Sequence, residues 1–580
     1  MSDKKNEVFL TIHGHFYQPP RENPWLEAIE LQDSALPFHD WNERINTECY
    51  NPNSVSKIVD SRNRILDVVN NYEHMSYNFG PTLLSWMEQF APLTYERIIK
   101  ADIESIPEHN GHGNAIAQVY NHIIMPLANE QDKQTQVKWG IRDFEYRFGR
   151  KPEGMWLAET AVDDDTLRVL EENGIKFTIL SPYQAEKFRK KGDKEWTDVS
   201  WGNIDPARSY KYNIKSAPGK SIDLFFYDGA ISRSVAFDEL LKDGNKFIKR
   251  LKEGVSECRD YPQLINIATD GESYGHHTKF GDMALAYVLK IKAKDEGFTI
   301  TNYAEYLEKY ESDCEVEIKQ ASSWSCFHGV GRWKEDCGCS TGGHPGWNQK
   351  WRKPLRDALD YLRDEFASLF EQEGAKYFDN VWEVRNKYIE VILDRNEMNV
   401  KKFQQENFRP DLSDEDKVKA MELLEIQRQS LLMYTSCGWF FSEISGIETV
   451  QIMKYAARAM QLASRFTSKN LEEHFLNILA EAKSNIPEHG TGKDIFERFV
   501  KPSIVTTKQI ASLWALSSLY QDFEDEESVY CYTIRKEAYK KVQKGASTFV
   551  VGHIEIQSKI TLQKSNVMFA LMQYAGGDFH

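Results

Sequence analysis

Over roughly the first 310 residues, short apolar runs alternate with helical patterns, and this alternation restricts the fold more than any other feature of the sequence. Strand-like runs lie at 8–12, 154–158, 176–180, 222–226, 264–268 and 298–300. Helical patterns are expected at 55–70, 164–173, 237–251 and 283–294. Strands that alternate with helices predict parallel βα units with right-handed crossovers. We therefore expect an α/β domain, either a barrel or a doubly wound sheet.

Two of the predicted strands end in polar side chains. The run 264–268 stops at Asp270-Gly271, which favours a turn, and is followed by Glu272, Tyr274 and His276. The run 154–158 ends in Glu159, just before the acidic helix start at 163–165. Active sites of parallel α/β domains lie at the carboxyl ends of strands. Glu159 and Asp270 are thus the kind of carboxylate pair that cleaves a glycosidic bond, although an ordinary Asp-Gly turn is the simpler interpretation of 270–271.

The first predicted strand runs into His13, His15 and Gln18. Residues at alternate positions of a strand point to the same face, so the two histidines share surroundings. They are suited to binding a metal, donating hydrogen bonds to a substrate or capping a buried network; no third ligand lies near them in sequence. His112 lies in a glycine-rich turn at 109–115 that forms either a loop before a helix or a third wall of the same pocket.

Composition excludes several classes of protein. The net charge of −16 without a dense basic block argues against nucleic acid or an anionic membrane as a partner. No apolar run reaches the length of a membrane span, and residues 1–5 lead to no signal-peptide core. The eight cysteines are mostly scattered, which suits a reducing compartment. We expect a cytoplasmic enzyme.

Residues 320–352 form a long irregular segment rich in Trp, Cys, His and Gly, and such segments are usually functional. Zinc binding is one interpretation, with candidate ligands Cys326, His328, Cys337, Cys339 and His344. However, Cys-x-Cys is a weaker signal than Cys-x-x-Cys, so we favour a loop whose tryptophans line a sugar cleft. On that interpretation, chelator treatment leaves folding and activity unchanged.

These patterns predict four regions. Residues 1–315 form the α/β catalytic domain and 316–353 the Trp- and Cys-rich loop. Residues 354–522 are helical throughout. Residues 523–580 are expected to form a β-like region, either a small one by itself or the start of one that a longer chain completes, with strand-like runs at 548–551 and 567–572.

Five short motifs carry a resemblance to a known family: HGHFYQP at 13–19, GHGN at 111–114, WLAE at 156–159, TDGESYG at 269–275 and WFF at 439–441. In this order they resemble glycoside hydrolase family 57, in a branch with an additional C-terminal domain of unknown function. The resemblance implies an incomplete (β/α)7 barrel followed by helices, acting on α-glucans or maltooligosaccharides with retention of anomeric configuration. It implies Glu159 as nucleophile and Asp270 as acid/base, and places the family's first-motif histidine on His13 or His15. The second motif has Asn114 where many members carry a carboxylate, so the resemblance does not define the substrate closely.

A retaining mechanism needs one ionised carboxylate and one protonated carboxyl group close together. Glu272 is the rival of Asp270 for the acid role, because a continuing strand would place it on the same face. We expect neither a metal nor a cofactor. The residues expected to bind substrate are His13, His15, Gln18, His112, Trp156, Glu272, Tyr274, His276, Trp324, Trp333 and Trp439.

Three functions remain open at this point. The first is a retaining α-glucan enzyme, whether hydrolase, glucanotransferase or branching enzyme. The second is a metal-dependent hydrolase of the deacetylase type, with His13, His15 and Asp270 around zinc. The third is a catalytically silent glucan-binding protein. The sequence leaves the oligomeric state undetermined.

Overall fold

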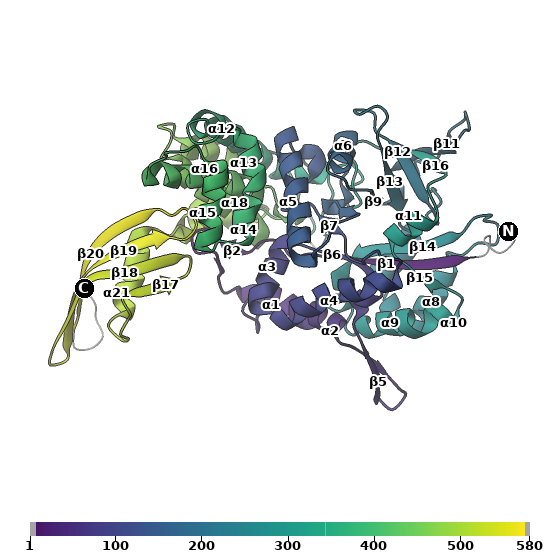
Figure 1. The fold of residues 1–580 in the computed structure, drawn as a ribbon, viewed down its shortest axis with the longest axis horizontal. Helices are drawn as coiled ribbons and strands as arrows, with labels where there is room; N and C mark the ends of the chain where they lie inside the picture. The colour runs from purple at the N-terminus through teal and green to yellow at the C-terminus, as the bar shows by residue number, and fades with distance from the viewer. Residues whose placement is uncertain (1–6, 343, 575–580) are drawn as a thin grey trace. The chain divides into compact units, whose positions relative to one another are not determined.

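The computed structural model describes residues 7–342 and 344–574, which divide into two compact units (Figure 1). The first unit holds the chain up to Pro20, Leu31–Thr341 and Tyr434–Phe440. The second holds Arg21–Glu30, Gly342–Met433 and the chain from Phe441 onward. No helix among these described residues combines the length and the apolar character that crossing a bilayer requires.

Seven strands of the first unit form a connected series of parallel pairings, and the short β15 (Thr299–Ile300) also pairs in parallel with β1. In chain order the seven strands are β1 (Val8–Phe16), β6 (Ser76–Phe79), β7 (Ala117–Gln118), β8 (Met155–Trp156), β9 (Phe177–Leu180), β13 (Ser221–Phe226) and β14 (Gln263–Asp270). Strand β1 pairs with both β14 and β6, β7 pairs with β8, and β9 pairs with β13. Single parallel bridges connect β6 to the β7 segment and the β8 segment to β9. No ladder joins β13 to β14 among the described residues, so the ring of pairings is open there.

The helices between these strands begin where the sequence supplies caps. Helix α6 (Asp164–Glu172) confirms the pattern at 164–173: the Asp163 carboxylate accepts the Thr166 N–H at its start, and Gly174 follows its end with φ +84°. The pattern predicted at 237–251 is two helices instead. Helix α7 (Gly229–Phe237) ends where it was expected to begin, and Asp243 caps α8 (Gly244–Lys252).

The helix predicted at 55–70 is wrong, because this stretch is the hairpin of β4 (Ser56–Val59) and β5 (Ile65–Val69). The Asp60 carboxylate accepts the N–H groups of Arg62 and Arg64, which closes a tight turn. Asn63 occupies the left-handed region at φ +59°, a conformation that asparagine tolerates. The local turn and the β-branched residues of the two flanking strands outweigh the helical spacing of the apolar residues.

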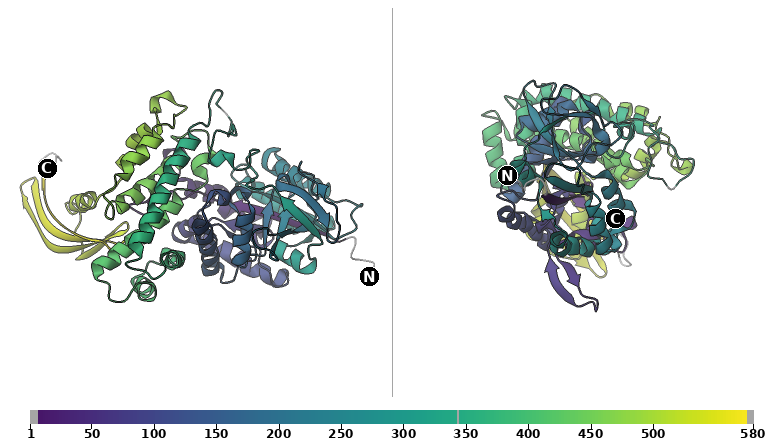
Figure 2. Two further views of the ribbon diagram at one scale, coloured as in Figure 1. Left: turned by 90° about the horizontal axis from the view of Figure 1, so that it is seen from above. Right: turned by 90° about the vertical axis from the view of Figure 1, so that its right-hand side faces the viewer.

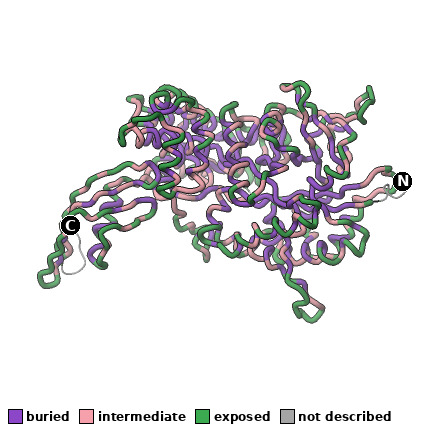
Figure 3. The backbone as a smooth tube through the Cα atoms, viewed as in Figure 1, coloured by how far each residue is buried: buried purple, intermediate pink, exposed green. Residues whose placement is uncertain are grey.

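Strands β9 and β13 also form one end of a second, six-stranded sheet. Its order is β11 (Thr197–Asp198), β10 (Ala185–Lys190), β16 (Cys314–Ile318), β12 (Ser209–Asn213), β13 and β9. Strand β16 leads directly into the irregular segment that begins near residue 319. Strands β1 and β14 run through the buried interior of this unit (Figure 3), and Asp270 reaches solvent only at the end of β14.

The second unit is mainly helical and ends in a sheet. Helices α12 (Arg352–Gly374), α16 (Asp414–Leu432) and α18 (Ile447–Ala463) pack against one another (Figure 2), which confirms the predicted helical character of this region. The strand-like runs near the C-terminus lie in β19 (Ser547–Ser558) and β20 (Lys564–Gln573). With β17 (Glu526–Val529) and β18 (Tyr532–Lys544) they form an antiparallel sheet that packs on α21 (Thr507–Ser517).

Candidate active site

An open cavity of about 1210 Å³ lies in the first unit, and both predicted catalytic carboxylates line it. Glu159 follows β8 and Asp270 ends β14, so two separate strands deliver the acidic groups to one space. The volume exceeds that of a typical small-ligand pocket.

Glu159 lies in a strained turn. Its backbone has φ +57° and ψ +22°, and the next residue, Thr160, has φ +51°. Both residues thus lie in the left-handed region of backbone conformation, where a non-glycine residue costs of order 1–3 kcal/mol. The Gln184 side chain stabilises the turn by accepting the Thr160 hydroxyl at 2.8 Å and donating to the Thr160 carbonyl at 2.8 Å. Strain maintained in this way is characteristic of functional positions.

Two donors from the irregular segment hold the Glu159 carboxylate. The Trp324 indole N–H and the Ser325 hydroxyl both donate to Oε2, at 2.9 and 2.7 Å. The two residues are also linked through their backbones, because the Trp324 N–H donates to the Glu159 carbonyl at 3.0 Å. Burial raises the pKa of Glu159, while the two donors and the charge of Arg332 oppose that rise by favouring the ionised form.

The Asp270 carboxyl group has different surroundings from that of Glu159. Its side chain faces the open cavity, so water reaches it, yet protein surrounds the site closely. The surrounding protein limits the hydration of the charged carboxylate. This desolvation, together with the negative charges of Glu272 and Glu159, raises the pKa of Asp270 well above the usual range of a carboxyl group. Asp270 is therefore suited to retain a proton while Glu159 is ionised.

Glu272 lies in a third environment. Its Oε1 accepts the Tyr50 hydroxyl at 2.5 Å and the Tyr17 N–H at 3.2 Å, and the residue is buried. Burial raises its pKa to about 7. Glu272 is not among the described residues that line the cavity of Glu159 and Asp270. This placement favours Asp270 over Glu272 for a reaction in that cavity.

A buried cluster of histidines lies at the end of β1. Asn78 bonds to both His13, at 3.1 Å, and His15, at 3.3 Å. His15 Nε2 lies 3.1 Å from His122 Nε2, and His122 Nδ1 lies 2.7 Å from the Ser436 hydroxyl. Burial lowers the pKa values of His13 and His122 to about 3, so both are neutral near pH 7. Sequence reasoning missed His122, which is an isolated histidine outside the five motifs.

Among the other predicted site residues, Trp156 of the third motif contacts this cluster. The Trp156 ring stacks on those of His13 and His15, each at a centroid distance of 4.9 Å. Gln18 is half-buried, Tyr274 is buried with its hydroxyl 3.4 Å from that of Thr269, and His276 pairs with Glu48. Within residues 7–342 and 344–574, His13, His15 and Asp270 do not converge as a group that could hold a metal ion.

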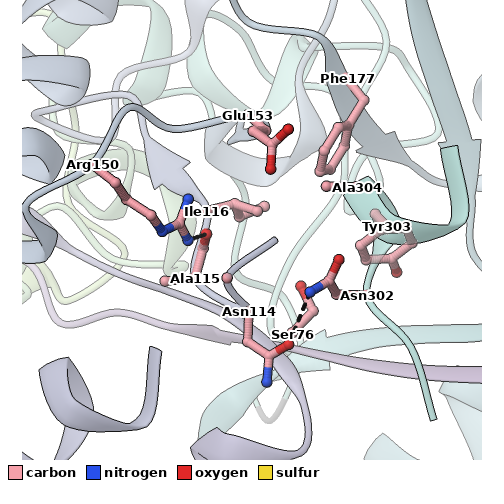
Figure 4. Close-up of a pocket in the computed structure, with 11 residues that line it drawn as sticks. Ser76, Asn114, Ala115, Ile116, Arg150, Glu153, Phe177, Asn302, Tyr303 and Ala304 are labelled. Atoms are coloured by element: carbon pink, nitrogen blue, oxygen red, sulfur yellow. Dashed lines mark hydrogen bonds between the residues drawn. The ribbon is translucent and has the colours of Figure 1, made fainter. Parts of the chain in front are cut away.

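The second motif lies at a smaller pocket (Figure 4). Asn114 accepts a hydrogen bond from the Asn302 amide at 3.2 Å, and His112 Nδ1 lies 2.8 Å from Glu153 Oε2. His112 is not among the described residues that line the large cavity. The structure therefore brings together the first, third and fourth motifs. The second motif, which was one candidate for a third side of the same pocket, lies apart from Glu159 and Asp270.

Aromatic side chains line the large cavity. Trp324 is one of them, whereas Trp333 and Trp439 are fully buried. Four strongly exposed aromatic residues that also line the cavity were not predicted from the sequence: Tyr183, Trp201, Phe237 and Phe327. Trp201 follows Ser200 and precedes Gly202 in a turn, and a tryptophan among turn residues was the available signal.

We expect Trp201→Ala to weaken binding of long glucans roughly three- to tenfold, because the residue lines the cavity, is 86% exposed and offers a ring face on which a sugar can stack. Short maltooligosaccharides should lose less. KM values over a series of chain lengths measure this difference. Phe90→Ala, another exposed aromatic of the same unit that does not line the cavity, is the matched control. An equal loss at every chain length would contradict a stacking role for Trp201.

Comparison with known proteins identifies two matching regions. The model of glycosyl hydrolase family 57 matches residues 7–319, and that of a domain of unknown function, DUF3536, matches residues 347–580. Alpha-amylase 1 of Dictyoglomus thermophilum is 23% identical over 254 residues, which are 43% of this chain and 33% of that protein. The chain thus spans about one third of the length of this relative.

A solved structure shares the fold. The exo-type maltose-forming amylase of Pyrococcus sp. ST04 superposes with a TM-score of 0.61 at 18% identity, covering 84% of this chain and 88% of that one. At this identity the likeness shows the fold alone.

Proposed function

The chain belongs to glycosyl hydrolase family 57, and from that premise we propose that it is a retaining enzyme acting on α-glucans by double displacement. One observation carries the proposal: Glu159 and Asp270, from the ends of different strands, face the same cavity, while Glu272 is not among its described lining residues. In the same proposal, the seven parallel strands are the incomplete (β/α)7 barrel that the motifs imply.

The two carboxyl groups divide the reaction between them. Asp270 donates its proton to the glycosidic oxygen while a Glu159 oxygen attacks the anomeric carbon, so the leaving sugar departs and a glycosyl ester forms. A water molecule or a sugar hydroxyl then attacks the same carbon, its proton passes to Asp270, and the Glu159 carboxylate is released. The Trp324 and Ser325 donors orient Glu159 for both steps.

The pH profile of kcat/KM should be bell-shaped. Activity rises with pH as Glu159 ionises and falls at higher pH as Asp270 loses its proton, because the pKa of Asp270 is raised further. Asp270→Asn should abolish the alkaline limb in assays with an activated aryl glycoside. Glu272→Gln removes a negative charge that raises the pKa of Asp270, so its alkaline limb should shift to lower pH. An alkaline limb that persists in Asp270→Asn would contradict the assignment.

Product analysis on amylose and on maltooligosaccharides tests the function itself. Shorter glucans with new reducing ends indicate hydrolysis, and chains longer than the substrate indicate transfer. Glycogen binding without any product would overturn the enzymatic proposal in favour of a silent binding protein. Release of acetate from an acetylated polysaccharide, without cleavage of glycosidic bonds, would overturn it in favour of a deacetylase.

A further inference from the structure

Four potential metal ligands converge in the irregular segment that follows β16. One ligand atom from each of Cys326, His328, Cys337 and Cys339 lies within 4.8 Å of all the others. The Cys326 and Cys337 sulfurs are 3.8 Å apart, and the Cys339 sulfur lies 3.6 Å from His328 Nδ1. All four residues belong to the first unit, and none of the three cysteines forms a disulfide within the described residues.

The Cys326–Cys337 and Cys339–His328 separations match two edges of a tetrahedron around one zinc ion. Zinc bonds of about 2.3 Å to sulfur and about 2.0–2.1 Å to nitrogen, at tetrahedral angles, place two sulfurs about 3.8 Å apart and a sulfur and a nitrogen about 3.6 Å apart. Three thiolates and one imidazole form a common structural zinc set, with every position taken by protein. We propose that Cys326, His328, Cys337 and Cys339 bind one structural zinc ion.

The backbone of the segment is shaped to bring these ligands together. Gly338, between Cys337 and Cys339, has φ +79°, a conformation that glycine adopts without strain. Gly331 lies inside the loop, where an added Cβ would come within 3.0 Å of the Cys337 Cβ and 3.4 Å of the His328 Cβ. A side chain at position 331 would therefore press against two of the ligands.

The proposed site is joined to the Glu159 carboxylate through adjacent residues. Cys326 directly follows Ser325 and Trp324, the two donors to Glu159 Oε2. Arg332, between His328 and Cys337 in sequence, donates to the Ser325 carbonyl at 3.0 Å. Zinc would thus fix the loop that presents both donors, and its role toward catalysis is positioning. A zinc site here departs from the sequence-based expectation that the loop lines a sugar cleft and binds no metal.

Metal analysis of untagged, full-length protein tests the proposal. We expect about one zinc ion per chain that survives gel filtration, and loss of most of it in Cys337→Ser and Cys339→Ser. Cys258→Ser, which changes an exposed thiol away from the cluster, is the matched control and should retain the zinc. Cobalt substitution gives a second readout, because tetrahedral thiolate coordination produces characteristic visible absorption bands. Removing zinc with a chelator should lower the thermal midpoint by several degrees.

Three results would overturn the proposal. The first is purified protein with no zinc that neither takes up zinc nor changes its thermal midpoint in a chelator. The second is a zinc content unchanged in both cysteine variants, which would place the ion elsewhere. The third is a Cys326–Cys337 disulfide found by peptide mapping without reductant, which would make the pair redox-active. None of these results bears on whether the enzyme cleaves glucans, so the proposed function is tested separately.

Discussion

Glu159→Ala should keep the fold and reduce turnover by about 10⁴-fold or more, because the variant lacks the proposed nucleophile. Added azide should restore part of the rate, since the small anion enters the space left by the missing side chain. The product should then be a glycosyl azide of β configuration, inverted relative to an α-linked substrate. Rate measurements with and without azide, and NMR of the product, follow the effect.

The control for this variant is a second change at the same carboxylate. Glu159→Gln retains the size of the side chain beside Trp324 and Ser325 but removes its charge, so it should be inactive and gain less from azide. Unchanged circular dichroism in both variants separates loss of chemistry from loss of fold. Substantial turnover by Glu159→Ala without azide would contradict the assignment.

Asp270→Ala should slow cleavage of unactivated glucans by about 10²–10⁴-fold, since the leaving sugar is no longer protonated. Activated aryl glycosides need no protonation to depart, so their first step should be nearly unaffected. The second step still needs a base, and the glycosyl-enzyme should therefore accumulate. Pre-steady-state measurements should show a burst of the aryl alcohol followed by slow turnover.

Glu272→Gln is the matched comparison for this prediction. Its carboxylate is two residues from Asp270 and accepts the Tyr50 and Tyr17 donors. We expect this variant to show no burst and to keep its activity on glucans, apart from the shift in its pH profile. A burst in Glu272→Gln together with an active Asp270→Ala would reverse the two roles.

The features that the sequence predicted well depend on local patterns. Strand-end positions placed Glu159 and Asp270 at one cavity, because parallel strands end at the same edge. The cap at Asp163 and the glycine at 174 located helix α6. Where a local turn competes with periodicity the prediction was wrong, and the Asp60 turn converted the predicted helix at 55–70 into a hairpin.

Features that depend on long-range packing could not be predicted. His122 joins His15 although they are 107 residues apart, and Trp324 reaches Glu159 across 165 residues. The convergence of Cys326 and His328 with Cys337 and Cys339 depends on how glycines turn the loop, and spacing alone does not show it. Burial likewise separates Trp324, which lines the cavity, from Trp333, which is buried in the core.

The most direct test is to identify the residue that carries the sugar in the trapped intermediate. Asp270→Ala reacted with an activated glycosyl donor, quenched in acid and digested, should yield one peptide with an added glycosyl group on Glu159. A glycosyl group on Glu272 instead, or no covalent adduct together with a product of inverted anomeric configuration, would contradict double displacement through Glu159.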